Sequence, residues 1–327
     1  MSELQLHDKD VFKDHNENVI PHTLLERSEQ LDAYLFVPRD ATVLELGARY
    51  GTVSCIINRM LKNPKAHVAV EPDTVVIPAL EKNRERAGAS FHIWAGAVSK
   101  KPLQMDCSDY GGATRIVESS GNVKTISIEE LEKLHGLRFD TIVADCEGFF
   151  GQFVEENDMS KYRIILIEKD APWICDYNKI HETLVDSGFI MIKNEFNQVD
   201  RSVYVNTSHL GFKILQQSVG HGHLGLFGRI GYPTQLGTDV PVPEGWTSIS
   251  AHGHSEIVIE ATNELKLKGG LLPSAQKPPA ILFICDGVTV GTLTRANEIT
   301  NTIVLTPGKH TLSISTGCWA HSVWYIQ

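Results

Sequence analysis

Long apolar runs are missing from this sequence. No stretch of about 18 consecutive apolar residues, the length that spans a bilayer as a helix, occurs along its 327 residues. Residues 1–14 are polar and mixed in charge, without the apolar core of a signal peptide. We therefore expect a chain that is not inserted into a membrane.

Paired cysteines and an excess of positive charge are also missing. Six cysteines are scattered without a Cys-x-x-Cys pair, which favours free thiols in a reducing cytosol and a cytoplasmic protein. Lysine and arginine number 30 against 40 aspartates and glutamates, a formal net charge of −10. Binding along a nucleic-acid backbone needs clustered positive charge, so we expect no nucleic-acid partner, although a local basic patch stays open.

What is present is an ordinary globular composition. Hydrophobic residues make up 42% of the chain and charged residues 21%. A chain of this length contains about two domains as a first expectation, and each can bury a core.

Strand-like and helix-like segments alternate through the first two thirds of the chain. Alternation of this kind predicts an α/β fold with a doubly wound, mostly parallel sheet covered by helices on both faces. Ser127-Ile-Glu-Glu130 forms a capping box that begins one of the helices. The seven predicted strands cover residues 42–46, 67–70, 91–94, 139–144, 163–167, 189–196 and 202–205, and the predicted helices cover 24–37, 52–61, 75–87, 127–134 and 180–187.

The pattern changes near residue 210. Five glycines fall between residues 220 and 231, which is typical of a linker, and the helical period is absent from about residue 240 onward. Short β-branched runs with a turn at Asp286-Gly287 predict a small all-β sandwich. We therefore predict a first domain with an N-terminal helical segment over 1–209, a glycine-rich linker over 210–239 and a β-sandwich domain over 240–327.

The strongest functional motif is VLELGARYGTVS, residues 43–54. A strand ends in Glu45, Gly47 and Gly51 follow, and a helix begins. In an open α/β sheet such a loop lies at the carboxyl edge, where ligands bind, and Gly47 lets the backbone approach the ligand closely. The Gly-x-x-x-Gly spacing differs from the Gly-x-Gly-x-x-Gly of dinucleotide sites, which favours a ligand without a diphosphate.

Two further segments extend this site. The second strand ends in VAVEPD, which puts Glu71 at a strand tip, where a carboxylate can accept hydrogen bonds from both hydroxyls of a ribose. The third strand is followed by small residues, including Gly96 and Ala97, which leave room for a flat adenine ring or simply form a tight strand exit.

These segments resemble the FkbM type of S-adenosylmethionine-dependent methyltransferases, a branch of the class I, Rossmann-like methyltransferase fold. The resemblance covers about residues 20–207 and rests, in order, on LELGARYG, VAVEPD, AGAVS, VKTISIEEL, VADCEG and IILIEKD. The chain departs from the family at Arg49, where asparagine is frequent, and at Phe150, where glutamate is frequent. The resemblance implies S-adenosylmethionine as cofactor, held by Glu45, Gly47, Ala48, Arg49, Tyr50, Gly51, Glu71, Pro72, Asp73, Gly96 and Ala97.

Carboxylates gather where the reacting group would lie. Asp145 and Glu147 follow the fourth strand, and Glu168 and Asp170 lie at the tip of the fifth. Methyl transfer from a sulfonium is an in-line displacement that needs an aligned acceptor and removal of its proton. Asp145, Glu147 and Glu168 are therefore the predicted catalytic residues, as base or acceptor-holding groups. Asp145, Glu168 and Asp170 are alternatively ligands for Mg²⁺ or another divalent cation, and a helix-capping role also stays open.

The sequence thus predicts a transferase that methylates a hydroxyl of a sugar or glycan, the sugar being implied by the resemblance. Alternatives are methylation of another small metabolite or a peptide, a dehydrogenase, and an inactive methyltransferase-like scaffold that presents a glycan-binding β domain. In that domain Trp246, Trp319, Trp324 and Tyr325 either stack on a sugar or fill the core. Whether the chain forms a homo-oligomer, through this domain or otherwise, is left open.

Overall fold

The computed structural model describes most of the chain in two compact units. The described residues are 11–21, 26–105, 121–196, 200–219, 230–231, 247–252, 255–271, 280–295, 298–315 and 321–327. Met1–Ser187 with Asn194–Val203 forms one unit, here called the α/β unit, and Gly188–Lys193 with Tyr204–Gln327 forms the other, here called the β unit.

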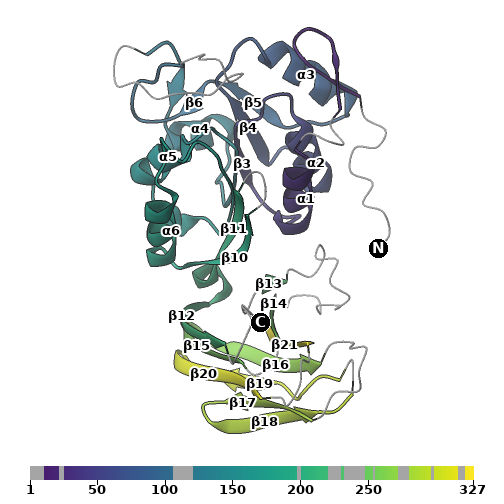
Figure 1. The fold of residues 1–327 in the computed structure, drawn as a ribbon, viewed down its shortest axis with the longest axis vertical. Coiled ribbons are helices and arrows are strands. Elements are labelled where there is room, and N and C mark those ends of the chain that lie inside the picture. The colour runs from purple at the N-terminus through teal and green to yellow at the C-terminus, as the bar shows by residue number, and fades with distance from the viewer. Residues whose placement is uncertain are drawn as a thin grey trace. The chain divides into compact units, whose positions relative to one another are not determined.

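A seven-stranded sheet organises the first two thirds of the chain (Figure 1), as the alternating pattern predicted. The strands follow the order β10-β11-β9-β8-β3-β4-β5, and β9, β8, β3, β4 and β5 are parallel to one another. Their bounds are β3 (Val43–Leu46), β4 (His67–Glu71), β5 (His92–Ala95), β8 (Thr141–Ala144), β9 (Ile164–Lys169), β10 (Phe189–Phe196) and β11 (Asp200–Asn206).

The strand order reverses direction between β3 and β8. From β3 the chain proceeds outward through β4 and β5 on one side, and then through β8 and β9 on the other. In doubly wound sheets ligands bind outside the carboxyl ends of the strands at this switch point. All residues of β3, β4 and β8 are buried, as expected for central strands covered on both faces.

Helices cover both faces of the sheet. Figure 1 shows α1, α2 and α3 on one side and α4, α5 and α6 on the other. The predicted capping box is confirmed: the Ser127 hydroxyl accepts from the backbone N–H of Glu130, whose carboxylate accepts from the N–H of Ser127. The helices are α1 (Arg27–Phe36), α2 (Thr52–Met60), α3 (Ile77–Arg86), α4 (Ile128–His135), α5 (Phe150–Glu156) and α6 (Tyr177–Asp186), with a short 3₁₀ turn η1 (Met159–Lys161).

The prediction missed α5. Its seven residues contain Gly151, a poor helix former, and no side chain caps its N-terminus. A Cβ at this position would make a tight contact with the thiol sulfur of Cys175, at 3.1 Å, so packing favours the glycine. The two small paired strands β1 (Phe12–Lys13) with β2 (Val19–Ile20), and β6 (Ala97–Val98) with β7 (Thr125–Ile126), were also not predicted.

At Gly47 the loop after β3 contacts the backbone of the loop after β8. Its φ is +88°, in the left-handed region, and a Cβ built on it would lie only 1.6 Å from the carbonyl oxygen of Asp145. No other amino acid fits this contact without moving the backbone. The glycine therefore sets how closely the loops after the two strands approach each other.

In the β unit, the described strands that follow β11 form two five-stranded sheets. The order β12-β15-β20-β17-β18 forms one sheet and β13-β14-β21-β16-β19 the other. The first comprises β12 (Phe212–Val219), β15 (Ser255–Ala261), β20 (Gly308–Ser315), β17 (Ile281–Cys285) and β18 (Val288–Leu293). The second comprises β13 (Ile230–Gly231), β14 (Thr247–His252), β21 (His321–Ile326), β16 (Leu265–Leu271) and β19 (Ile303–Leu305); a 3₁₀ turn η2 (Thr207–Leu210) precedes β12.

The two sheets of the β unit contact each other through apolar side chains. The rings of Phe283 in β17 and Trp324 in β21 meet edge to face, with centroids 5.1 Å apart, and both residues are buried. Gly269 in β16 leaves the space that the Phe283 ring fills. Trp324 is therefore a core residue and not an exposed sugar platform, whereas Trp246 and Trp319 lie outside the described residues.

The predicted linker starts too early in the chain. Residues 212–219 form β12, which pairs with β15 as an edge strand of its sheet, so the part of the predicted linker from 210 to 219 belongs to folded structure. A bulge between Ile214 and Gln216 interrupts the two-residue alternation that would have indicated a strand. Residues 220–229 and 232–239 of that prediction lie outside the described residues.

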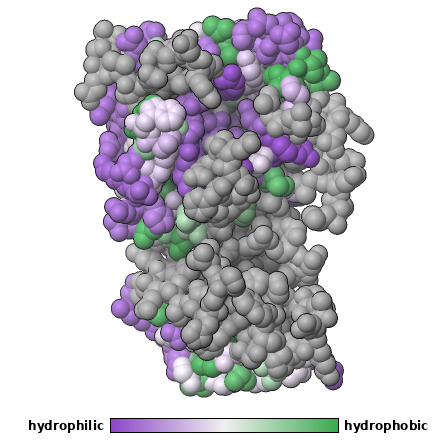
Figure 2. Space-filling model, in the orientation of Figure 1, coloured by the Kyte–Doolittle hydropathy of each residue, from purple (hydrophilic) through white to green (hydrophobic). Residues whose placement is uncertain are grey.

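The described surface carries no helix suited to a bilayer. Among the described residues no helix is both long and apolar enough to cross a membrane. On the face drawn in Figure 2, apolar residues in green form small separate groups among hydrophilic residues in purple. The most exposed large apolar side chain described is Trp173, at 78% exposure, in the loop after β9.

We predict that Gly47→Ala lowers the free energy of unfolding by more than about 2 kcal/mol, because it combines left-handed strain with a backbone collision. The matched control is Gly136→Ala at the end of α4. Gly136 has φ +66°, but a Cβ there meets nothing within 4 Å, so strain alone should cost about 1 kcal/mol. Urea unfolding followed by far-ultraviolet circular dichroism measures both, and equal losses would contradict the contact with Asp145.

Candidate functional site

An open pocket lies at the carboxyl ends of β3, β4 and β8. About 710 Å³ of space lies between its walls, part of it open to solvent. Its lining residues are Leu46, Gly47, Arg49, Val70, Glu71, Pro72, Asp73, Val76, Gly96, Ala97, Val98, Asp145, Cys146, Glu147 and Phe149.

The loop after β3 forms one wall of the pocket. The backbone N–H groups of Gly47 and Ala48 donate to the carbonyl of Val70, at 3.0 and 3.1 Å, which ties the loop to β4. Arg49, with φ +43°, and Gly51, with φ +81°, bend the chain into α2. This tight path brings the backbone of Gly47 to the pocket without an intervening side chain.

Glu71 occupies the tip of β4 and is 6% exposed. One carboxylate oxygen accepts from the backbone N–H of Arg49 at 2.7 Å, and the other accepts from the N–H of Asp73 at 2.8 Å. Burial raises the pKa of Glu71, while these two hydrogen bonds oppose the shift. Each carboxylate oxygen has two acceptor positions, so the pair can still accept from two hydroxyls of a ligand.

The chain leaving β5 closes the pocket on the next side. Gly96 donates its N–H to the carbonyl of Glu71 at 2.9 Å, and Ala97 donates to the carbonyl of Lys124 at the same distance. A Cβ on Gly96 would lie 2.2 Å from the Lys124 carbonyl oxygen. A residue without a side chain is therefore required at Gly96 by the backbone just before β7.

Four residues of the predicted donor site do not line this pocket. Glu45 is buried and hydrogen-bonds His67 at 3.0 Å. Ala48 is buried, and the Tyr50 hydroxyl pairs with His15 at 2.9 Å. Gly51 forms the N-cap of α2, where a Cβ would lie 2.7 Å from Leu80. The other seven, Gly47, Arg49, Glu71, Pro72, Asp73, Gly96 and Ala97, all line it.

Carboxylates concentrate at the ends of β8 and β9. Carboxylate oxygens of Asp145 and Glu168 lie with one of Glu29 inside a group whose atoms are all within 4.8 Å of one another. Burial, followed by the charge of Glu168, raises the pKa of Asp145 well above its usual range. Burial, followed by the charge of Asp145, does the same for Glu29. Both shifts favour the protonated forms of these two carboxyl groups.

Glu147 is in a different position. It lines the pocket with a left-handed backbone at φ +50°. Burial and a hydrogen bond with Asp170 raise the pKa of Glu147 to about 7. Asp170 in turn accepts from the N–H of Gly148 at 3.1 Å and from the hydroxyl of Tyr177 at 3.2 Å. Glu147 is thus a carboxyl that changes protonation near neutral pH beside the pocket.

The group of carboxylates in the structure differs from the predicted metal ligands by one residue. Asp145 and Glu168 lie together as predicted, but the third carboxylate of their group is Glu29 and not Asp170. Asp170 is held away by its bonds to Gly148 and Tyr177. An all-oxygen set of three carboxylates has the donor chemistry that Mg²⁺ or Ca²⁺ prefers.

The sequence interpretation missed Glu26 and Glu29. Glu26 precedes α1, where its carboxylate accepts a hydrogen bond from the Thr52 hydroxyl, and Glu29 lies in the first turn of α1. Glu26 and Glu29 are three residues apart, a spacing that would put both on one face of the helix predicted over 24–37, and this was the only available signal. Their proximity to Asp145 depends on how α1 packs and could not be read from spacing.

Comparisons with known proteins give matches in structure only. No family model matches the chain, and no curated protein matches it in sequence. The O-methyltransferase TomG from Streptomyces achromogenes, solved with SAM, matches with a TM-score of 0.37 and 14% identity over 57% of this chain and 83% of that chain.

Two further solved structures give similar values. An O-methyltransferase from Bacillus cereus, solved with SAH, has a TM-score of 0.36 and 13% identity over 57% of this chain and 82% of that chain. The precorrin-6y C5,15-methyltransferase from Geobacter metallireducens has a TM-score of 0.34 and 13% identity over 55% and 87%. Similarity at this level assigns no activity to this chain.

Proposed function

We propose that the chain is an S-adenosylmethionine-dependent methyltransferase whose donor occupies the pocket at β3, β4 and β8. One observation carries the proposal: a single pocket is lined by Gly47, Glu71 and the ionisable Glu147. Binding of a nucleoside and proton removal from an acceptor are the two tasks of such an enzyme. The strand order and the switch point at β3 and β8 support the same placement.

The donor's adenosine would lie between the tips of β4 and β5. Glu71 would accept from the ribose hydroxyls, and the exit of β5 at Gly96 and Ala97 would face the base. Gly47 would let the rest of the donor pass over the end of β3 toward Asp145. Supplying an already activated methyl group is the cofactor's own chemistry, and the protein's part is alignment and proton removal.

Glu147 is the residue best suited to take the proton from the acceptor. A general base works best when its pKa lies near the operating pH, and the pKa of Glu147 is about 7. Burial and the charge of Glu168 raise the pKa of Asp145, which favours its protonated form, so it would act as a hydrogen-bond donor that positions the acceptor. Glu168 would orient Asp145 from β9.

A hydroxyl of a sugar or glycan is the proposed acceptor, on the basis of the sequence resemblance. Carboxylates at the reacting end support this, because they can accept hydrogen bonds from neighbouring hydroxyls. The assay incubates the full chain with isotope-labelled S-adenosylmethionine and separate panels of glycans, peptides and small metabolites, and mass spectrometry seeks a labelled methyl group on each acceptor. Label found only on peptides or small metabolites would show that these are the acceptors and not glycans. No methyl transfer to any acceptor would support a scaffold role.

We predict that Glu71→Gln weakens binding of S-adenosylhomocysteine at least about tenfold, because bonds to the charged carboxylate contribute about 1.5–3 kcal/mol. Wild-type protein should also bind adenosine more tightly than 2′,3′-dideoxyadenosine, and the variant should lose this preference. Isothermal titration calorimetry measures both comparisons. Glu81→Gln, on the exposed side of α3, is the control and should bind like wild type. A ribose preference that survives in Glu71→Gln would refute the assignment.

We predict that methyl transfer increases as pH rises through about 7, because only the ionised form of Glu147 can accept a proton. Glu147→Gln should abolish this ascending limb of kcat/KM. Asp170→Asn removes the neighbouring negative charge, so the pKa of Glu147 should fall and the limb should move to lower pH. Carbon-13 NMR of the side-chain carboxyl gives the same pKa without an acceptor. An unchanged limb in Glu147→Gln would exclude Glu147 as the base.

A further inference from the structure

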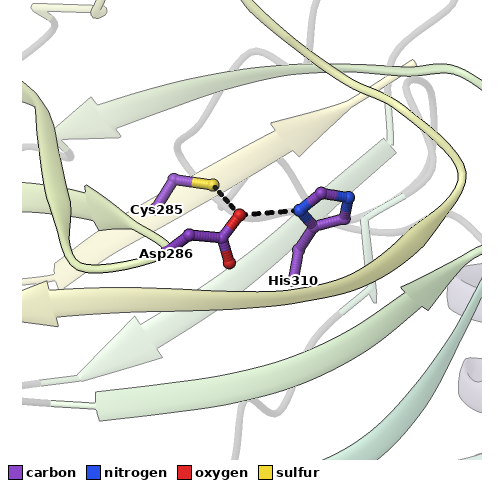
Figure 3. A group of neighbouring side chains, drawn as sticks. All are labelled: Cys285, Asp286 and His310. Carbon is purple, nitrogen blue, oxygen red and sulfur yellow. Dashed lines mark hydrogen bonds and ion pairs between the residues drawn. The ribbon is translucent and has the colours of Figure 1, made fainter.

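Three side chains of different chemistry converge at one end of the β unit, far along the chain from the pocket residues. Cys285 is the last residue of β17, Asp286 begins the turn that follows, and His310 is the third residue of β20 (Figure 3). The Cys285 sulfur lies 3.8 Å from Asp286 Oδ2, which lies 2.7 Å from His310 Nδ1. The three donor atoms all lie within 4.8 Å of one another.

Strand pairing and turn geometry produce this arrangement. Cys285 pairs with Leu312 across β17 and β20, so the two share a face, and His310 lies on that face two residues before Leu312. Asp286 and Gly287 have φ values of +49° and +78°, as in a two-residue hairpin turn of type I′. The turn brings the Asp286 carboxylate back toward the imidazole.

Outer hydrogen bonds hold two of these side chains in place. His310 Nε2 contacts the backbone carbonyl of Thr306 at 2.8 Å, so Nε2 carries a proton and donates it outward, while Nδ1 faces the group. The backbone N–H of Thr311 donates to Asp286 Oδ1 at 2.7 Å, which leaves Oδ2 facing the group. Metal-binding histidines and carboxylates are usually oriented by such bonds from their outward-facing atoms.

We propose that Cys285, Asp286 and His310 form a site for Zn²⁺ or a closely related divalent ion, bound through Sγ, Oδ2 and Nδ1. Sulfur, nitrogen and oxygen ligands of this kind suit Zn²⁺, whereas Mg²⁺ and Ca²⁺ prefer oxygen alone. Zinc bonds of about 2.0–2.3 Å put tetrahedral ligand atoms roughly 3–4 Å apart. The sulfur–oxygen distance already fits, and the carboxylate must separate slightly from the imidazole to admit the ion.

Binding exchanges protons for the metal. The thiol proton of Cys285 and the proton between Nδ1 and the Asp286 carboxylate pass to solvent as the three bonds to the metal form. Three protein ligands leave the fourth position of a tetrahedral ion for water or another small ligand. The ion would link the β17–β18 turn to β20 and so stabilise this end of the sheet.

Binding of Zn²⁺ to the full chain is measured by equilibrium dialysis against a chelator-buffered metal series. Co²⁺ replaces Zn²⁺ in a second series, because a thiolate ligand gives Co²⁺ an intense near-ultraviolet charge-transfer absorption. We expect this absorption at one equivalent of Co²⁺, and a rise in the thermal unfolding midpoint when Zn²⁺ is added. Cys285→Ser should abolish the absorption, and His310→Gln should lower Zn²⁺ affinity at least about tenfold.

Two further variants separate metal binding from folding. Asn tolerates the left-handed turn position, so the Asp286→Asn variant should fold normally. Its Zn²⁺ affinity should nevertheless be lower than that of the wild type. Cys175→Ser changes a buried thiol of the α/β unit and should leave the cobalt spectrum unchanged. The proposal is overturned if the cobalt complex shows no thiolate absorption, or if Asp286→Asn and His310→Gln retain wild-type affinity; the three side chains would then form only a hydrogen-bonded clamp.

Discussion

The close approach of Gly47 to the carbonyl of Asp145 is the contact on which the pocket depends. A Cβ on Gly47 would lie 1.6 Å from that oxygen, so the loops after β3 and β8 are in direct backbone contact, with no side chain between them. The loop after β3 leads to Arg49, whose N–H holds the Glu71 carboxylate, and the loop after β8 leads to Glu147. The nucleoside end and the reacting end of the proposed site are therefore positioned by one backbone contact, and a shift of either loop would change both.

The carboxyl groups at the reacting end would distinguish the proposed donor from its product. Glu29, Asp145 and Glu168 lie within 4.8 Å of one another, and burial among like charges raises the pKa of Glu29 and of Asp145. A nearby cation interacts favourably with such a group, because it stabilises the ionised forms that burial and like charges disfavour. A sulfonium is a cation, whereas the thioether left after methyl transfer is neutral. The cluster would therefore favour the donor over its product, which assists product release without any additional contact.

The sequence predicted local features well and long-range contacts poorly. All seven strands of the sheet and the capping box at Ser127 were predicted, because burial on both faces and cap chemistry are written in neighbouring residues. Glu71 was assigned to a strand tip for the same reason, and the structure puts it in the pocket lining. By contrast, Glu29 joins Asp145 only because α1 packs beside the sheet, and no spacing in the sequence encodes that packing. Strand β12 escaped prediction because a bulge breaks its alternation.

The two carboxylate-containing groups suit different metal ions. Whether catalysis uses an ion and whether the β unit binds one are therefore separate questions. Glu29, Asp145 and Glu168 offer only oxygen, which suits a hard ion at the reacting end. The group around Cys285 adds sulfur and nitrogen and lies in the β unit, outside the proposed catalytic pocket. A chelator acts on both, so loss of activity in a chelator would not by itself identify a catalytic ion. Rescue by Mg²⁺ alone would indicate the oxygen group, whereas rescue that needs Zn²⁺ and Cys285 would indicate that the β unit must be intact for catalysis.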